Sequence, residues 1–179
     1  MRTFISIDLP EQVRDSIAQV SREFTGDGVI LVDKSVMHLS LHFLGDLDND
    51  QIEVVKESMN GIKAKSFEVG IRGLDFFNPS FLKVIFARVT DGAAECTDIY
   101  NQISDSLVSK GIPMEEREYT PHVTIARVKR VRNPRAIVSQ IRSHSDTDFG
   151  KFTASSVKLK YSELTPEGPI YTDLYELKF

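Results

Sequence analysis

The eight residues MHLSLHFL, numbers 37–44, return in similar form as PHVTIARV, numbers 121–128. Both stretches place a histidine two residues before a hydroxyl side chain, and the two histidines are 84 residues apart. At the same interval Asn49 corresponds to Asn133, and each asparagine is a suitable N-cap for residues with the apolar spacing of an amphipathic helix. The chain therefore contains an internal repeat.

Each copy of the motif lies inside the same order of predicted elements, which is strand, helix, histidine strand, helix, strand. Helices are expected at 10–24 and 93–110, before the histidine strands. The expected strands are 4–7, 37–44, 66–74, 84–89, 121–128, 152–161 and 171–179. This pattern predicts one α+β domain over residues 1–179, with two packed lobes at roughly 1–78 and 79–179 that meet near residues 78–80. Each lobe is expected to hold its own sheet, with helices on the outer face.

Alternation along a strand puts His38 and Ser40 on one face and the leucines between and after them on the other. His122 and Thr124 repeat this pattern. If a pseudo-twofold axis relates the halves, these four polar side chains line one cleft. A histidine titrates near pH 6.5 and can act as acid or base, and hydroxyl groups donate hydrogen bonds to phosphate oxygens. The duplicated pair therefore predicts phosphodiester cleavage that requires no metal.

The composition is typical of a soluble globular protein and narrows the partners. The 179 residues include 22 Lys and Arg against 26 Asp and Glu, a net charge of -4. This acidic balance argues against a protein that coats nucleic acid, although one nucleic-acid end could bind in a local basic pocket. The single cysteine, Cys96, excludes an internal disulfide and a cysteine-rich zinc site. Without a long apolar segment or a signal peptide, a cytoplasmic protein is expected, and its internal symmetry favours a monomer.

The motifs and their flanks resemble the 2H phosphoesterase superfamily, specifically the RNA 2',3'-cyclic phosphodiesterases historically called 2'-5' RNA ligases. The matching segments follow in order over almost the whole chain, and they are MRTFISI (1–7), HLSLHFLG (38–45), YTPHVTIAR (119–127) and GPIY (168–171). One departure is Ser40, where relatives often carry threonine. Serine keeps the hydroxyl but lacks the rotamer stiffness of a β-branched side chain.

The resemblance implies a duplicated two-lobe fold whose antiparallel sheets line a central cleft, with helices on the outer faces. It implies hydrolysis of RNA 2',3'-cyclic phosphate ends to 2'-phosphate ends without metal or cofactor, and reversible 2'-5' joining of RNA ends as a side activity. His122 would be the general base on water and His38 the general acid for the departing 3'-oxygen, with Ser40 and Thr124 on the phosphate oxygens. From the residues alone, either histidine could take either role.

Phe43 and Arg127 occupy equivalent positions five residues after the two histidines. Together they could hold a terminal base by stacking and cation–π attraction. Strict alternation would turn both toward the buried face, so this substrate-binding hypothesis needs a bulge or a strand end nearby. The same alternation places His42 on the face of His38. The basic residues after Arg127 could contact RNA phosphates upstream of the end, and they are Lys129, Arg130, Arg132 and Arg135.

Two alternatives remain open at this stage. The first keeps the chemistry but takes a small cyclic nucleotide or an ADP-ribose cyclic phosphate as substrate. The second is a non-catalytic nucleotide-binding or RNA-binding module that retains the cleft. A metal-dependent hydrolase lacks a convincing cluster of carboxylates and histidines, and the sequence contains neither a P-loop nor a GxGxxG motif.

Overall fold

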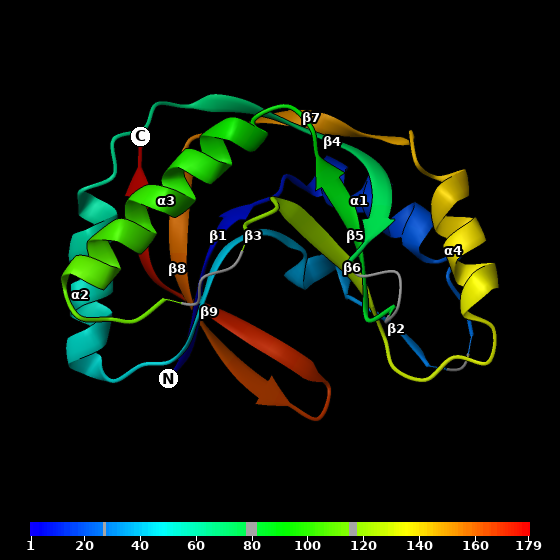
Figure 1. Ribbon diagram of the computed structural model, residues 1–179, viewed down its shortest axis with the longest axis horizontal. Coiled ribbons are helices and arrows are strands. Elements are labelled where there is room, and N and C mark those ends of the chain that lie inside the picture. Colours follow the sequence, from blue (N-terminus) through cyan, green and yellow to red (C-terminus); the bar gives the residue numbers. More distant parts are fainter. Residues whose placement is uncertain (27, 78–81, 115–117) are drawn as a thin grey trace.

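The computed structural model describes residues 1–26, 28–77, 82–114 and 118–179. Within these residues, nine strands form one antiparallel sheet in the order β7-β4-β5-β6-β3-β1-β8-β9, with β2 paired to β6 (Figure 1). The strands are β1 (Arg2–Asp8), β2 (Val29–Leu31), β3 (His38–Asp46), β4 (Phe67–Phe76), β5 (Val84–Val89), β6 (His122–Val128), β7 (Asp148–Ala154), β8 (Ser156–Thr165) and β9 (Gly168–Lys178). The helices are α1 (Glu11–Ser21), α2 (Asn49–Asn60), α3 (Ala93–Ser109) and α4 (Pro134–Ser143), with a 3-10 turn, η1 (Lys34–Val36).

Strands from the two halves of the sequence are interleaved in this sheet. β8 and β9, from the second half, extend the sheet beyond β1, whereas β4, from the first half, lies between β5 and β7. One continuous sheet therefore replaces the separate lobe sheets that the repeat predicted. The expected joint at residues 78–80 lies outside the described residues, and the division into lobes at 1–78 and 79–179 stays a prediction.

The predicted strand at 152–161 is wrong, because the chain changes its place in the sheet within that range. β7 ends at Ala154 and pairs with β4, while β8 begins at Ser156 and pairs with β1. Apolar residues alternate through both strands, so their periodicity does not mark the break. β9 also begins earlier than expected, since Gly168 already pairs with Thr165 across the β8–β9 turn.

Four helices cover the described sheet in two groups (Figure 1). α2 packs against α3, which contacts β3, while α1 contacts β7 and β6 and α4 contacts β4. The predicted apolar faces of α1 and α3 are buried, as Ile17 and Ile103 illustrate, whereas in α4 only Ile141 is buried. Asn133 caps α4 as expected, by accepting from the Ala136 amide. The predicted cap at Asn49 is wrong, because Asp48 forms the capping box with Gln51.

Each histidine strand carries a β-bulge at the same point of the repeat. The register between β1 and β3 passes over Leu41, and the register between β5 and β6 passes over Ile125, which is 84 residues later. Both side chains are buried in the apolar core. Because a bulge inserts one residue, the side chains beyond it face the side opposite to the one that strict alternation predicts.

Candidate active site

The two histidine strands pair with each other near the middle of the sheet. Leu39 lies opposite Val123, and Ser40 lies opposite His122. Val123 is also the residue 84 positions after Leu39, so the pseudo-twofold axis of the repeat passes between these two side chains. The axis relates His38 to His122. The sequence repeat therefore corresponds to a spatial symmetry centred on the Leu39–Val123 pair.

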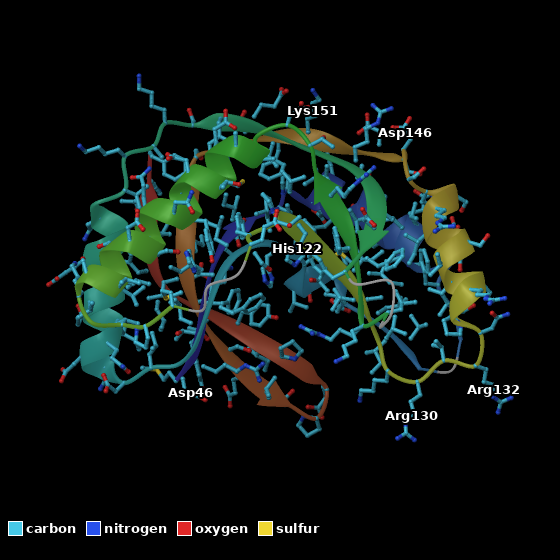
Figure 2. All side chains as sticks on the ribbon, viewed as in Figure 1. Asp46, His122, Arg130, Arg132, Asp146 and Lys151 are labelled. Carbon is cyan, nitrogen blue, oxygen red and sulfur yellow. The ribbon has the colours of Figure 1, made fainter. Side chains whose placement is uncertain are left out.

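The four polar side chains of the motif share one face of β3 and β6, which we call the site face. Leu39 and Val123 are fully buried on the other face, in the core. Continuing the register makes His38 and His122 diagonal neighbours, whose separation in an antiparallel pair is about 7–8 Å. Figure 2 shows His122 close to the centre of the molecule. The structure therefore brings both predicted histidines together, along with Ser40.

Both imidazoles are held by the same hydrogen bond. Nδ1 of His38 lies 2.9 Å from the carbonyl oxygen of Val36, and Nδ1 of His122 lies 2.8 Å from that of Thr120. A carbonyl oxygen only accepts, so each Nδ1 donates and each neutral ring has its lone pair at Nε2. The acceptor is in both cases the residue two positions earlier. Nε2 of each ring is consequently the atom that remains for proton transfer.

Aromatic rings flank each imidazole. The His38 ring centroid lies 4.7 Å from that of Phe4 and 5.5 Å from that of Tyr171. The His122 ring centroid lies 5.1 Å from that of Phe77 and 5.3 Å from that of Phe86, both edge to face. These rings restrict the orientation of each imidazole and exclude water from its sides.

Burial lowers the pKa of both histidines below the usual value, and the carbonyl hydrogen bonds oppose this effect only in part. At His38 the positive charge of Lys160 lowers the pKa further, the carboxylate of Asp8 raises it, and protonation of His122 lowers it. Each ring is therefore mostly neutral at pH 7 in the free protein.

Three stacked rings and one hydrogen bond support the backbone at Ser40. The hydroxyl of Tyr119 donates to the Ser40 carbonyl oxygen at 2.9 Å. Tyr119 stacks on Tyr100 at 4.3 Å, and Tyr100 stacks on His42 at 4.1 Å between ring centroids. The hydrogen bond fixes the backbone position from which the Ser40 hydroxyl projects. Thr124, on the partner strand, is half-buried.

The two bulges place Phe43 and Arg127 on the site face, as the substrate-binding hypothesis requires. Phe43 is 63% exposed, and its ring lies 6.3 Å from Phe4, which packs on His38. Arg127 is exposed on β6. Burial raises the pKa of Tyr171, the other ring beside His38, and the positive charge of Arg127 opposes this effect. Both side chains are therefore accessible near the histidines.

The expectation that His42 borders the cleft is wrong, because the bulge at Leu41 turns it to the opposite face. His42 is 3% exposed, and its Nε2 lies 2.9 Å from the carbonyl oxygen of Tyr100 in α3. Two of the basic residues that follow Arg127 also lie away from His122. Arg130 and Arg132 project outward at the periphery, far from His122 (Figure 2).

A family model described as the AKAP7 2'5' RNA ligase-like domain matches residues 4–179. The chain belongs to this family. The resemblance drawn from the paired motifs is thereby confirmed. Two curated relatives are both named RNA 2',3'-cyclic phosphodiesterase. The protein of Methanocaldococcus jannaschii is 35% identical and covers 98% of this chain and 99% of its own length. That of Aeropyrum pernix is 36% identical and covers 93% of each.

Solved structures of similar shape agree with this family and confirm the α+β fold. The crystal structure of TT0787 from Thermus thermophilus superposes with a TM-score of 0.84 at 25% identity, over 99% of this chain and 97% of that one. The structure of LigT from E. coli complexed with 3'-AMP gives a TM-score of 0.81 at 18% identity, with the same coverage. The strongly curled antiparallel sheet is therefore the fold of this 2'5' RNA ligase-like domain.

In the described part of the 2'5' RNA ligase-like domain, no group of three or more histidine, cysteine, aspartate or glutamate side chains is arranged to hold a metal ion. No helix within residues 1–26, 28–77, 82–114 and 118–179 is long and apolar enough to cross a membrane.

Sequence reasoning missed several side chains that build the site of this 2'5' RNA ligase-like domain. Phe4 and Phe86 read as ordinary strand residues, although each packs on a histidine. Asp8, which pairs in register with His38, and Lys160 form part of an ion cluster beside it. Alternation along β1 would have placed Phe4 and Asp8 on the same face, but only the pairing of β1 with β3 shows that this face is the site face.

Proposed function

We propose that the chain hydrolyses RNA 2',3'-cyclic phosphate ends to 2'-phosphate ends by acid–base catalysis between two histidines. The observation that carries the proposal is the pair of imidazoles, each with Nδ1 tied to a carbonyl and Nε2 available, on either side of the Leu39–Val123 pair. The names of the curated relatives support the RNA end as the substrate class.

In the proposed reaction Nε2 of His122 accepts a proton from water, and the water oxygen attacks phosphorus. The bond between phosphorus and the ribose 3'-oxygen breaks as His38 donates its proton to that oxygen. The ribose keeps a 2'-phosphate. The family resemblance supports this division of roles. When the 5'-hydroxyl of a second RNA replaces water, the product is a 2'-5' bond, and cleavage of that bond exchanges the two histidines' roles.

The neighbouring side chains are proposed to bind the substrate. Ser40 and Thr124 donate hydrogen bonds to the two non-bridging oxygens, where negative charge develops during attack. Phe43 and Arg127 hold the terminal base. No metal or cofactor takes part. All these groups belong to one chain, so we also propose that residues 1–179 act as one domain and as a monomer. We further propose that the protein acts in the cytoplasm. A solution mass well above 20.2 kDa would contradict the monomer.

The direct test uses a short RNA ending in a 2',3'-cyclic phosphate, with EDTA present. The expected product is a 2'-phosphate, identified by phosphorus NMR. Adenosine 2',3'-cyclic phosphate and ADP-ribose cyclic phosphate are assayed in parallel, and a higher kcat/KM for either would favour the small-nucleotide alternative. Binding of the RNA end without turnover would instead identify a non-catalytic module, and loss of turnover with EDTA would exclude the metal-free mechanism.

The lowered histidine pKa values predict an acid-shifted pH profile. Catalysis needs one neutral and one protonated imidazole, so activity falls at low pH as the base is protonated and at high pH as the acid is deprotonated. Since burial lowers both pKa values, we expect kcat/KM to peak below about pH 6.5. The bound phosphate monoanion favours the protonated rings, so the profile of kcat should lie at higher pH. Coincident profiles centred above pH 7 would contradict this assignment.

Arg127→Ala is expected to raise KM for the RNA cyclic phosphate about tenfold with a smaller change in kcat, because base stacking contributes roughly 1–3 kcal/mol. Phe43→Ala should do the same. Arg130→Ala is the matched control, since Arg130 projects away from the histidines and its loss removes the same charge. If KM is unchanged in Arg127→Ala, this side chain does not hold the base.

A further inference from the structure

A cavity of about 240 Å³ adjoins His38 at the end of the histidine strand. Of the four motif side chains, its described lining includes only His38. The cavity therefore adjoins one of the four side chains that are proposed to surround the reacting phosphorus. The polar residues that line it are Asp8, Arg14, Ser35, His38, Lys160 and Tyr171.

The ion cluster in the wall of this cavity is neutral as a whole. Lys160 Nζ lies 2.8 Å from Asp8 and 3.1 Å from Asp173, and Lys158 Nζ lies 2.8 Å and 2.7 Å from the same two carboxylates. Burial disfavours the Asp8 carboxylate, but the two lysines outweigh this effect and keep its pKa below the usual value. Two lysines thus balance two aspartates, and Asp8 does not add a free negative charge to the lining.

Arg14, on α1, gives the cavity its net positive charge. Its Nε is buried without a hydrogen-bond partner among the described residues, and its Nη1 is 3.5 Å from the Ser35 carbonyl oxygen, the outer limit of a hydrogen bond. Within the described part of the chain, no carboxylate forms an ion pair with it. Because a partly buried cation without a counter-charge is costly, this wall favours an anionic ligand.

We propose that the Arg14 cavity binds the phosphodiester that joins the last two nucleotides of an RNA substrate. The inference rests on the proposed function. In that function His38 donates its proton to the ribose 3'-oxygen, so the nucleotide lies on the His38 side. The next group along the chain is the phosphate on the 5'-oxygen of that ribose. A guanidinium is suited to it, since its planar donors match phosphate oxygens. The cavity thereby distinguishes an RNA end from a mononucleoside cyclic phosphate, which lacks this group.

The test compares kcat/KM for the dinucleotide ApA 2',3'-cyclic phosphate with that for adenosine 2',3'-cyclic phosphate. In Arg14→Gln the ratio of the two values should fall about tenfold from that of the unmodified protein, the effect of one lost charge-assisted hydrogen bond. Arg14→Lys, which keeps the charge, should recover part of the ratio. The salt dependence of log KM for the dinucleotide should become shallower by about 0.7 in Arg14→Gln. Arg22→Gln, at the exposed end of α1, is the matched control and should keep the ratio.

The outcomes separate this inference from the proposed function. If the unmodified protein turns over both substrates and the ratio is the same in Arg14→Gln, the Arg14 cavity does not bind the linking phosphate, although the hydrolase remains. An equal fall in Arg22→Gln would assign the effect to net charge and overturn the inference. If the unmodified protein turns over neither substrate, the proposed function fails and the inference with it.

Discussion

Either His38→Ala or His122→Ala is expected to lower kcat/KM for an RNA 2',3'-cyclic phosphate by roughly 10²–10⁴-fold, the contribution of a positioned general acid or base. Each variant removes one Nε2 from a pair that the carbonyls of Val36 and Thr120 hold in one orientation. The double variant should lose little more than the worse single variant, because the two groups act in one proton transfer sequence. Single-turnover assays with EDTA measure all three losses.

His144→Ala is the matched control for both variants. His144 follows α4, where its Nε2 lies 2.8 Å from a Glu23 carboxylate oxygen, and it takes no part in the histidine pair. Its kcat/KM should stay within about twofold of the unmodified protein. A ribonucleoside 2'-(4-nitrophenyl phosphate) separates the roles, since its 3'-hydroxyl attacks phosphorus with the two roles exchanged and 4-nitrophenolate leaves without a proton. His122→Ala should be rescued on this substrate and His38→Ala should not, and the opposite result would reverse the assignment.

The second large effect is expected at the hydroxyl groups. Thr124→Val and Ser40→Ala should each lower kcat by roughly 10²–10³-fold, the cost of removing one donor to a developing oxyanion. Valine keeps the shape and the β-branching of threonine, so the Thr124 variant isolates the hydroxyl. The loss should fall mainly on kcat, because the hydrogen bond strengthens as negative charge develops in the transition state.

Thr153→Val provides the control for a threonine-to-valine change on an exposed strand position of the same sheet. It should leave kcat unchanged. Ser40→Thr is the complementary variant, and it should keep activity because the hydroxyl is retained. If Thr124→Val raised KM alone and left kcat intact, the hydroxyl would bind ground state and transition state equally and would not stabilise the attack.

The repeat made the centre of the site predictable because of one coincidence of register. Leu39 pairs with the residue that is also its counterpart in the repeat, Val123. Equivalent positions in the sequence therefore had to be neighbours in space, and alternation alone then placed His38 and Ser40 on the same face as His122. Without that register, two similar strands would have been distant copies of one another.

The positions of the other site residues depend on local structural features that the apolar periodicity of the sequence does not show. The bulges at Leu41 and Ile125 turned His42 into the core and Phe43 to the surface, against strict alternation. The break at Ser155 separates β7, at one end of the sheet, from β8, near the other end, although the alternation of apolar residues continues. The ion cluster of Lys160 with Asp8 joins two strands that are far apart in the sequence, so only the β1–β8 pairing reveals it.

That same β1–β8 pairing governs how the chain is completed during synthesis. Thr3 pairs with Tyr161, so β1 emerges from the ribosome 158 residues before its outer neighbour. At about 5–20 residues per second, the outer edge of β1 waits for roughly 8–30 s. During that interval its unpaired amide and carbonyl groups are open to any strand nearby. The nascent first half therefore cannot reach its final structure alone, and the sheet beside His38 is complete only when β8 and β9 have been synthesised.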